Sequence, residues 1–221
     1  MMHPAMTQVP QLWREITARL EGLGAWLAPL GLRLIMAWEF GEAGLEKLRG
    51  ENWFSHIRDS FPFPFSMVSP EISWMLATWT ELVGAVALLL GLFTRFFAFS
   101  LLILTFVATA AVHWPESWSS LAELWQGYAI TDDGSGNYKL PLLFALMLLP
   151  LVLNGAGKLS LDQLLGKALL PTPGQPGTDA AAWFLAGLGL GLPLATLFPV
   201  PGLGLAVLGA AGLAWTAIGR R

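Results

Sequence analysis

The sequence predicts an all-α protein that crosses a membrane several times, and three observations support this fold class. Of its 221 residues, 55% are hydrophobic and only 12% are charged, whereas a typical soluble domain has about 25% charged residues. Several apolar runs approach or reach the length of about 18 residues that a helix needs to cross hydrocarbon. The final run, residues 181–218, is too long for one crossing and is interrupted by FPVPG, a stretch with two prolines.

Six segments are expected to form membrane-crossing helices. Their approximate bounds are Gly24–Leu48, Ile72–Phe93, Phe96–His113, Tyr138–Asn154, Ala181–Phe198 and Gly202–Ile218. The last two come from the long final run, because the prolines of the FPVPG stretch cannot continue a helix. A tight hairpin that crosses the membrane twice is the favoured interpretation, and a re-entrant hairpin that never crosses is the alternative.

Two helix boundaries carry clear capping signals. Ser69-Pro70-Glu71 supplies an N-cap hydroxyl, a proline at the first helical position and an acid in the first turn. Ser120 and Glu123 fit a capping box and predict a short helix in the loop before the fourth crossing.

The chain is predicted to have four parts. Apolar residues in the first part recur at steps of three and four, at Leu12, Ile16, Leu20 and Leu23. This spacing predicts an amphipathic helix that lies on the membrane surface. The parts are residues 1–23, the amphipathic segment; 24–165, a four-helix membrane domain; 166–180, a Pro/Gly linker; and 181–221, the hairpin.

Composition also excludes several classes of function. The chain has no cysteine, so it has no disulfide, no thiolate metal site and no Fe–S ligand of its own. Its net charge is -3 and it has no block of Lys or Arg, which argues against a nucleic-acid partner. No cleavable signal peptide is expected at the N-terminus. The distribution of Lys and Arg favours a topology with both termini inside.

The stretch MAWEFGEAGLEKLRG places acids in or beside the first crossing. Glu39, Glu42 and Glu46 are three and four residues apart, so they share a helix face. Glu39 and Glu42 lie at hydrocarbon depth, whereas Glu46 and Lys47 can reach the interface. Lys47 is also a candidate residue of the ligand or proton site. An acid at that depth must be protonated, face water or have a partner. Glu39 and Glu42 therefore predict a polar site open to the outer leaflet.

Arg33 of the first crossing and Glu81 of the second are predicted to pair in the bundle interior. An unpaired charge there costs at least about 2.5–3.5 kcal/mol. The pair would either organise a ligand site or simply hold two helices together. Trp38 and Trp79 are the candidates to flank an aromatic head group.

A second group of candidates is expected near the outer face. His56, His113 and Glu116 could bind a metal ion or relay protons together with Glu39 or Glu42. The alternative is that His113 is an interfacial residue at a helix end and His56 an ordinary loop residue.

The order of several short motifs resembles the DoxX family of small four-helix bacterial membrane proteins. The motifs are Arg33, Phe40, Gly44, Lys47 and Leu48, then Glu81-x-x-Gly84, Leu90-Gly91-Leu92-x-Thr94-Arg95, and Gly155-x-Gly157-Lys158-x-Ser160-Leu161-Asp162. The resemblance covers about residues 24–165, and the C-terminal hairpin is an extension of the usual pattern. It implies a multi-pass protein of the bacterial cytoplasmic (inner) membrane.

The resemblance leaves several functions open. One DoxD-type relative is similar to a subunit of thiosulfate:quinone oxidoreductase, and other members are linked to membrane redox complexes and oxidative stress. The resemblance favours a redox-associated subunit that binds a quinone-like molecule near Arg33 and Glu81. Glu39 and Glu42 would then handle protons, and other redox subunits would be its partners. The loop 114–137 resembles members encoded beside peptide-modification and copper-stress genes, so a non-catalytic accessory protein is the alternative. A small-solute transporter is the third hypothesis. Whether the chain is an enzyme, and its oligomeric state, stay open.

Overall fold

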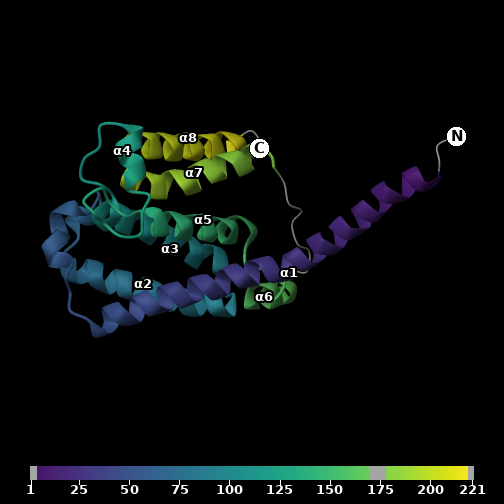
Figure 1. The fold of residues 1–221 in the computed structure, drawn as a ribbon, viewed down its shortest axis with the longest axis horizontal. Helices are drawn as coiled ribbons and strands as arrows, with labels where there is room; N and C mark the ends of the chain where they lie inside the picture. The colour runs from purple at the N-terminus through teal and green to yellow at the C-terminus, as the bar shows by residue number, and fades with distance from the viewer. Residues whose placement is uncertain (1–3, 170–177, 219–221) are drawn as a thin grey trace.

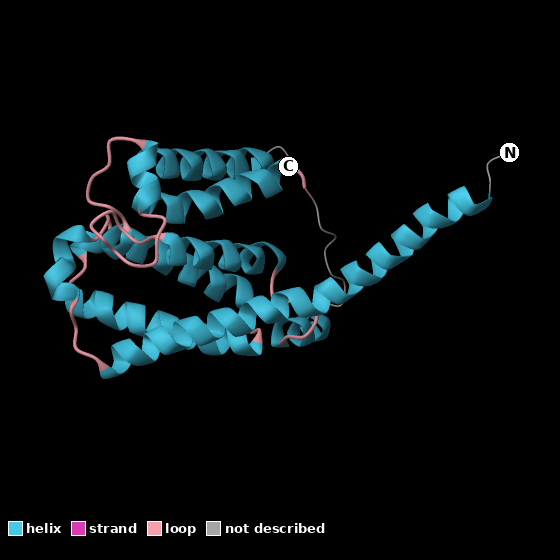
Figure 2. Cartoon of the chain, viewed as in Figure 1, coloured by secondary structure: helices cyan, strands magenta, loops and turns pink. Residues whose placement is uncertain are grey.

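Every regular element of the described chain is a helix, which confirms the all-α fold class. The computed structural model describes residues 4–169 and 178–218 (Figures 1 and 2). The α-helices are α1 (Pro4–Arg49), α2 (Pro70–Leu90), α3 (Thr94–Ala108), α4 (Leu121–Gln126), α5 (Lys139–Asn154), α6 (Leu161–Leu169), α7 (Ala180–Leu197) and α8 (Pro199–Ile218). Two 3₁₀ helices, η1 (Phe54–Ser60) and η2 (Phe65–Met67), and a π-helical turn, η3 (Thr109–His113), complete the described elements.

The first helix is much longer than a membrane is thick. Its 46 residues correspond to about 69 Å of helix, more than twice the roughly 30 Å of a hydrocarbon core. Figure 1 shows its N-terminal half projecting away from the other helices. The helix has no break at residue 23, so the predicted amphipathic segment is continuous with the first crossing. Its position on a membrane surface stays a prediction, and residues 1–3 lie outside the described residues.

Four helices enclose the main core. α1 packs against α2 and α5, and α3 packs against α2 and α5. The buried side chains between them include Met36, Leu88, Leu101, Leu148 and Leu151. In Figure 1 the α2–α3 turn and α6 lie at one end of this bundle, and η1 and α4 lie at the other. We call these the α6 end and the η1 end.

Five of the six expected crossings are long and apolar enough to span a membrane. They are the helical segments Val9–Arg49, Pro70–Leu90, Thr94–His113, Ala180–Leu197 and Pro199–Ile218. The sixth expected crossing is α5, which has only 16 residues and corresponds to about 24 Å of helix. It lies between α1 and α3 in the bundle. The structure therefore confirms a polytopic helical bundle, with one helix shorter than a typical crossing.

The predicted C-terminal hairpin is present and tightly packed. Only Phe198 separates α7 from α8, and its ring contacts Trp114 edge to face at 5.4 Å between centroids. α7 packs along α8 and also against α3. A Cβ added at Gly209 of α8 would lie 2.9 Å from Leu188 Cα of α7. Glycine is therefore needed where the two backbones meet, as in closely packed membrane helices.

Both predicted capping signals form. The Ser69 hydroxyl accepts a hydrogen bond from Ile72 N at the start of α2. Ser120 Oγ accepts from Glu123 N at the start of α4. Glu123 Oε2 in turn accepts from the N–H and the hydroxyl of Ser119, both at 2.7 Å. These hydrogen bonds hold the pKa of the Glu123 carboxyl below its usual range.

The hairpin contact predicts that two glycines of α8 differ in their tolerance of a methyl group. Gly209→Ala should lower stability by about 1–3 kcal/mol, because the new Cβ overpacks the α7 backbone. Gly204→Ala is the matched control, since nothing lies within 4 Å of a Cβ at that position. Thermal unfolding of the purified protein in detergent, followed by tryptophan fluorescence, measures the difference. Equal melting temperatures for the two variants would contradict this packing.

Candidate functional site

A cavity of about 220 Å³ lies inside the four-helix bundle, towards the η1 end. We call it the Glu81 cavity. Most of its wall is apolar and includes Phe40 and Phe144, whose ring centroids are 5.7 Å apart. Its polar lining residues come from α1, α2, α3, η3 and the segment before α5: Glu39, Lys47, Glu81, Thr105, His113 and Asn137. Charged groups from separate helices therefore meet in an apolar enclosure.

An ion pair joins α1 to α2 at this cavity. Lys47 Nζ lies 2.9 Å from Glu81 Oε1, and Glu81 is only 5% exposed. Glu81 Oε2 is buried without a hydrogen-bond partner. Close approach of the helices depends on Gly44, where a Cβ would lie 3.1 Å from Glu81 Cβ. In this structure Lys47 therefore turns into the bundle and meets Glu81, and its ammonium does not extend outward to the interface.

The predicted Arg33–Glu81 pair is also wrong. Arg33 is buried, at 1% exposure, but it lies at the α6 end. Its Nη2 donates to Leu159 O at 2.6 Å and its Nη1 to Leu88 O at 3.4 Å. Arg33 and Lys47 are 14 residues apart, or about 21 Å along α1. Because Glu81 packs beside Gly44, it meets Lys47 and lies far from Arg33.

The acids of α1 do not all face the cavity. Glu39 is half-buried and lines it, whereas Glu42 and Glu46 are exposed. A step of three residues turns a helix by about 300°, so Glu42 points about 60° away from Glu39. The predicted polar site therefore contains Glu39 without Glu42.

The two candidate tryptophans lie on the outside of the bundle. Trp38 is 72% exposed and Trp79 is 54% exposed. Neither lines the Glu81 cavity. The aromatic rings that do line it, Phe40 and Phe144, are on the inward faces of α1 and α5.

The end of α3 widens into the π-helical turn η3, which brings His113 to the cavity. The Trp114 N–H donates to Thr109 O at 2.7 Å, the wider spacing of a π-turn. His113 Nδ1 lies 2.8 Å from Asn137 Oδ1. Asn137 Nδ2 donates to Ile130 O, which orients the amide with its oxygen towards His113. Since this oxygen only accepts, Nδ1 carries the proton and Nε2 is left to meet another group.

The other metal candidates do not join His113. His56 lies in η1, and Glu116 lies in the loop that follows η3. Both side chains are exposed. Among residues 4–169 and 178–218, no group of three or more His, Asp or Glu side chains could hold a metal ion. Thr105 and Asn137 line the cavity but were missed from the sequence, because a lone Thr or Asn has no spacing signal.

The α6 end holds a second cluster, made of charged side chains that bind helix termini. Arg33 reaches the last carbonyls of α2, as described above. Asp162 accepts from Phe93 N at 2.7 Å and Thr94 N at 2.9 Å at the start of α3. Arg95 Nη1 donates to the carbonyls of Val152 and Leu153 near the end of α5. The Asp162 and Arg95 interactions satisfy terminal backbone groups of α3 and α5, whereas the Leu88 carbonyl that Arg33 reaches also accepts from Gly91 N.

A proline in α1 completes this second cluster. Pro29 has no N–H, so the Ala25 carbonyl one turn earlier is free to accept from Lys158 N at 3.1 Å. A Cβ at Gly157 would lie 2.9 Å from the Pro29 ring. The motif glycines and charges of the α2–α3 turn and the α5–α6 loop thus hold the α6 end together.

A bundle of long apolar helices that buries Arg33 and Glu81 between them defines a polytopic membrane protein. The DoxX family model matches residues 28–114, which include Arg33, Lys47 and Glu81. A relative from Haemophilus influenzae, described as an uncharacterized protein, is 44% identical over 154 residues, which are 70% of this chain and 93% of the relative. The chain belongs to the DoxX family. No solved structure matches it.

The Lys47–Glu81 contact predicts unequal effects for its two members. Lys47→Met should destabilise the protein by about 3–5 kcal/mol, because it leaves a buried carboxylate without its cation. Glu81→Gln should cost less, since the Lys47 side chain is 20% exposed and can reach the interface. Unfolding in detergent, followed by tryptophan fluorescence, provides the measurement.

The double variant tests the coupling between the two residues. Lys47→Met with Glu81→Gln should recover much of the stability lost in Lys47→Met alone. Losses that simply add would show that the two side chains do not interact.

Proposed function

We propose that this protein is a redox-associated membrane subunit that binds a quinone-like molecule in the Glu81 cavity. The observation that carries the proposal is the cavity itself, an apolar enclosure within the bundle into which a buried acid, an ammonium and an imidazole are gathered. Ligand sites typically combine mostly apolar walls with a few polar groups. Intramembrane ionisable groups of this kind mark ligand or proton sites.

The shape and chemistry of the cavity suit a head group better than a whole lipid-like molecule. Its volume of about 220 Å³ is below the roughly 300–1,000 Å³ of sites for drug-sized ligands. A single flat ring would lie against Phe40 and Phe144, and its tail would extend into the bilayer. A quinone carbonyl needs a donor, and Lys47 has N–H groups beyond the one that Glu81 accepts.

Proton exchange is the chemistry that the lining residues would supply. Reduction of a quinone to a quinol takes up two electrons and two protons. Glu39 and His113 line the same cavity, and both residue types carry protons in enzymes. The electrons would come from a partner redox subunit, because the chain has no cysteine to hold an Fe–S cluster. The exposed faces of the bundle leave room for such a partner.

We further propose an inner-membrane topology with both termini in the cytoplasm. The first residues of α1, the α2–α3 turn, α6 and the end of α8 lie at the same end of the bundle in Figure 1. Segments at this end carry Arg14, Arg19, Arg95, Lys158 and Lys167. Basic residues in short loops favour the cytoplasmic side. Crossing of the membrane by the short helix α5 belongs to the same proposal.

A titration of the purified protein with a short-chain ubiquinone tests the ligand. Binding should quench tryptophan emission and raise the melting temperature of the wild type. Glu81→Gln and Lys47→Met should weaken binding at least tenfold, because they alter polar groups that line the cavity. Glu42→Gln is the matched control, since Glu42 is an exposed acid on α1 outside the cavity, and it should bind as the wild type does.

Other outcomes point to the alternative functions. Equal quinone affinities of Glu81→Gln and Glu42→Gln would show that the quinone does not bind in this cavity. No binding by the wild type would favour an accessory role in copper homeostasis or peptide maturation, for which neighbouring genes are the next observation. Uptake of small solutes into proteoliposomes would favour a transporter.

A further inference from the structure

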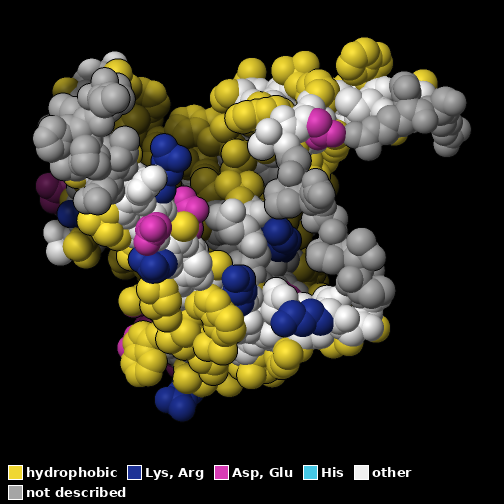
Figure 3. Space-filling model, turned by 90° about the vertical axis from the view of Figure 1, so that its right-hand side faces the viewer, with side chains coloured by type: hydrophobic (Ala, Val, Ile, Leu, Met, Phe, Trp, Pro, Cys, Tyr) yellow, Lys and Arg dark blue, Asp and Glu magenta, His cyan; other side chains and the backbone are white. Residues whose placement is uncertain are grey.

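A larger cavity, of about 880 Å³, opens at the α6 end of the bundle. We call it the Lys158 cavity. It lies between α1, the start of α3, the end of α5 and the loop that leads into α6. Figure 3 looks onto this end and shows Lys and Arg side chains spread over it, between apolar patches. None of the residues proposed to bind the quinone lines the Lys158 cavity.

Two cations line the Lys158 cavity and have no carboxylate partner. Arg95 lies at the start of α3 and Lys158 in the α5–α6 loop, and both are exposed. The ion pairs found within residues 9–169 and 178–218 are Arg19–Glu15 and Lys47–Glu81, so neither cation is paired there. Arg95 uses Nη1 for the α5 carbonyls. The Lys158 ammonium lies 6.0 Å from the Trp26 ring centroid, and its donors are available.

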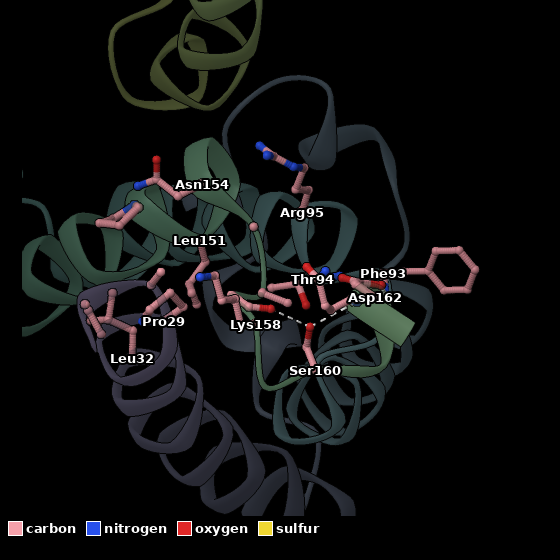
Figure 4. Close-up of a pocket in the computed structure, with 18 of the residues that line it drawn as sticks. Pro29, Leu32, Phe93, Thr94, Arg95, Leu151, Asn154, Lys158, Ser160 and Asp162 are labelled. Carbon is pink, nitrogen blue, oxygen red and sulfur yellow. Dashed lines mark hydrogen bonds between the residues drawn. The ribbon is translucent and has the colours of Figure 1, made fainter. Parts of the chain in front are cut away.

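The carboxylates of the same cavity do not offset these cations. Both oxygens of Asp162 accept hydrogen bonds from the α3 N-terminus, and Asp162 attracts the buried Arg33 guanidinium. Glu21, the other acidic lining residue, is exposed on α1. Figure 4 shows Asp162 beside Thr94 and Phe93, whereas the Arg95 side chain lies above them in the view and extends towards the side on which Asn154 lies. The cations are therefore free to meet an anion.

A buried hydroxyl is the independent observation that points to a ligand. Thr94 is fully buried and lines the cavity. Its Oγ1 has no hydrogen-bond partner, although buried hydroxyls are generally satisfied. Because the hydroxyl lies just behind the cavity surface, a ligand oxygen would supply the missing partner after a small movement of the wall.

The remaining wall is apolar and suits an acyl chain. Leu32, Phe93 and Phe96 line it, and both phenylalanines are exposed. The cavity lies where helices of the membrane bundle end, which is the depth of lipid head groups. Basic pockets between membrane helices at this depth bind anionic head groups.

We propose that the Lys158 cavity binds the phosphate of an anionic phospholipid, with Lys158 and Arg95 on the phosphate and the phenylalanines on the acyl chain. The lipid would bridge α1, α3 and α5. A soluble phosphate ester has the same anionic chemistry, so the experiment must separate the two sources.

The test measures lipid-dependent thermal stability of the whole protein in neutral detergent. Phosphatidylglycerol should raise the melting temperature more than phosphatidylcholine does. Lys158→Gln should weaken the apparent affinity for phosphatidylglycerol about fivefold, the loss expected for one cation near anionic lipid. Lys167→Gln is the matched control, because Lys167 is an exposed lysine of the adjacent helix α6 that does not line the cavity. It should behave as the wild type does.

Two further arms make the outcome decisive. Arg95→Gln should weaken the apparent affinity for phosphatidylglycerol as Lys158→Gln does. It replaces Lys158→Gln in the comparison if that variant does not fold. Glycerol 3-phosphate and inorganic phosphate, added without lipid, should not stabilise the protein. Stabilisation by either anion that Lys158→Gln abolishes would assign the cavity to a soluble phosphate and overturn the lipid. Equal effects of the two lipids, or equal losses in Lys158→Gln and Lys167→Gln, would overturn the site.

Discussion

The bundle depends on charged side chains that satisfy the ends of helices other than their own. Arg33 of α1 binds a carbonyl near the end of α2, Asp162 in the first turn of α6 binds the first amides of α3, and Arg95 of α3 binds carbonyls of α5. Backbone groups that lack partners are costly in or near hydrocarbon. Because each cap joins two helices, the caps also fix how far each helix extends past its neighbour. That offset places Lys47 beside Glu81 at the η1 end.

The fold could largely be predicted, because it follows from composition and run length. The apolar helices, the hairpin at FPVPG and the caps at Ser69 and Ser120 are local properties of the chain, whereas α6 was not predicted. The offset between α1 and α2 is not local. An apolar window locates the middle of a crossing only to within a few residues, and Arg33 was matched to Glu81 on that basis. The offset is set by the Arg33 contacts at the α6 end together with the close approach at Gly44, and the sequence records Gly44 only as one small residue among many.

The sequence predicted a polar site between the membrane helices, but it identified only some of the residues that line this site. Glu39, Lys47, Glu81 and His113 line the cavity, because ionisable residues inside a membrane bundle generally turn inward. The prediction failed where it required a rotation angle, as for Glu42, or an aromatic residue on the correct face, as for the two tryptophans. It also could not anticipate the π-turn that carries His113 to Asn137, since that turn forms through tertiary contacts.

Because α1 is unbroken, the residues that it contributes to the α6 end and to the Glu81 cavity belong to one rigid element. The same helix carries Ala25 and Arg33 at one end of the bundle and Glu39 and Lys47 at the other, without a non-helical residue between them. A stiff rod transmits torque along its axis. A protein that grips the projecting segment and twists it would therefore swing the lysine ammonium relative to its carboxylate more than 20 Å away.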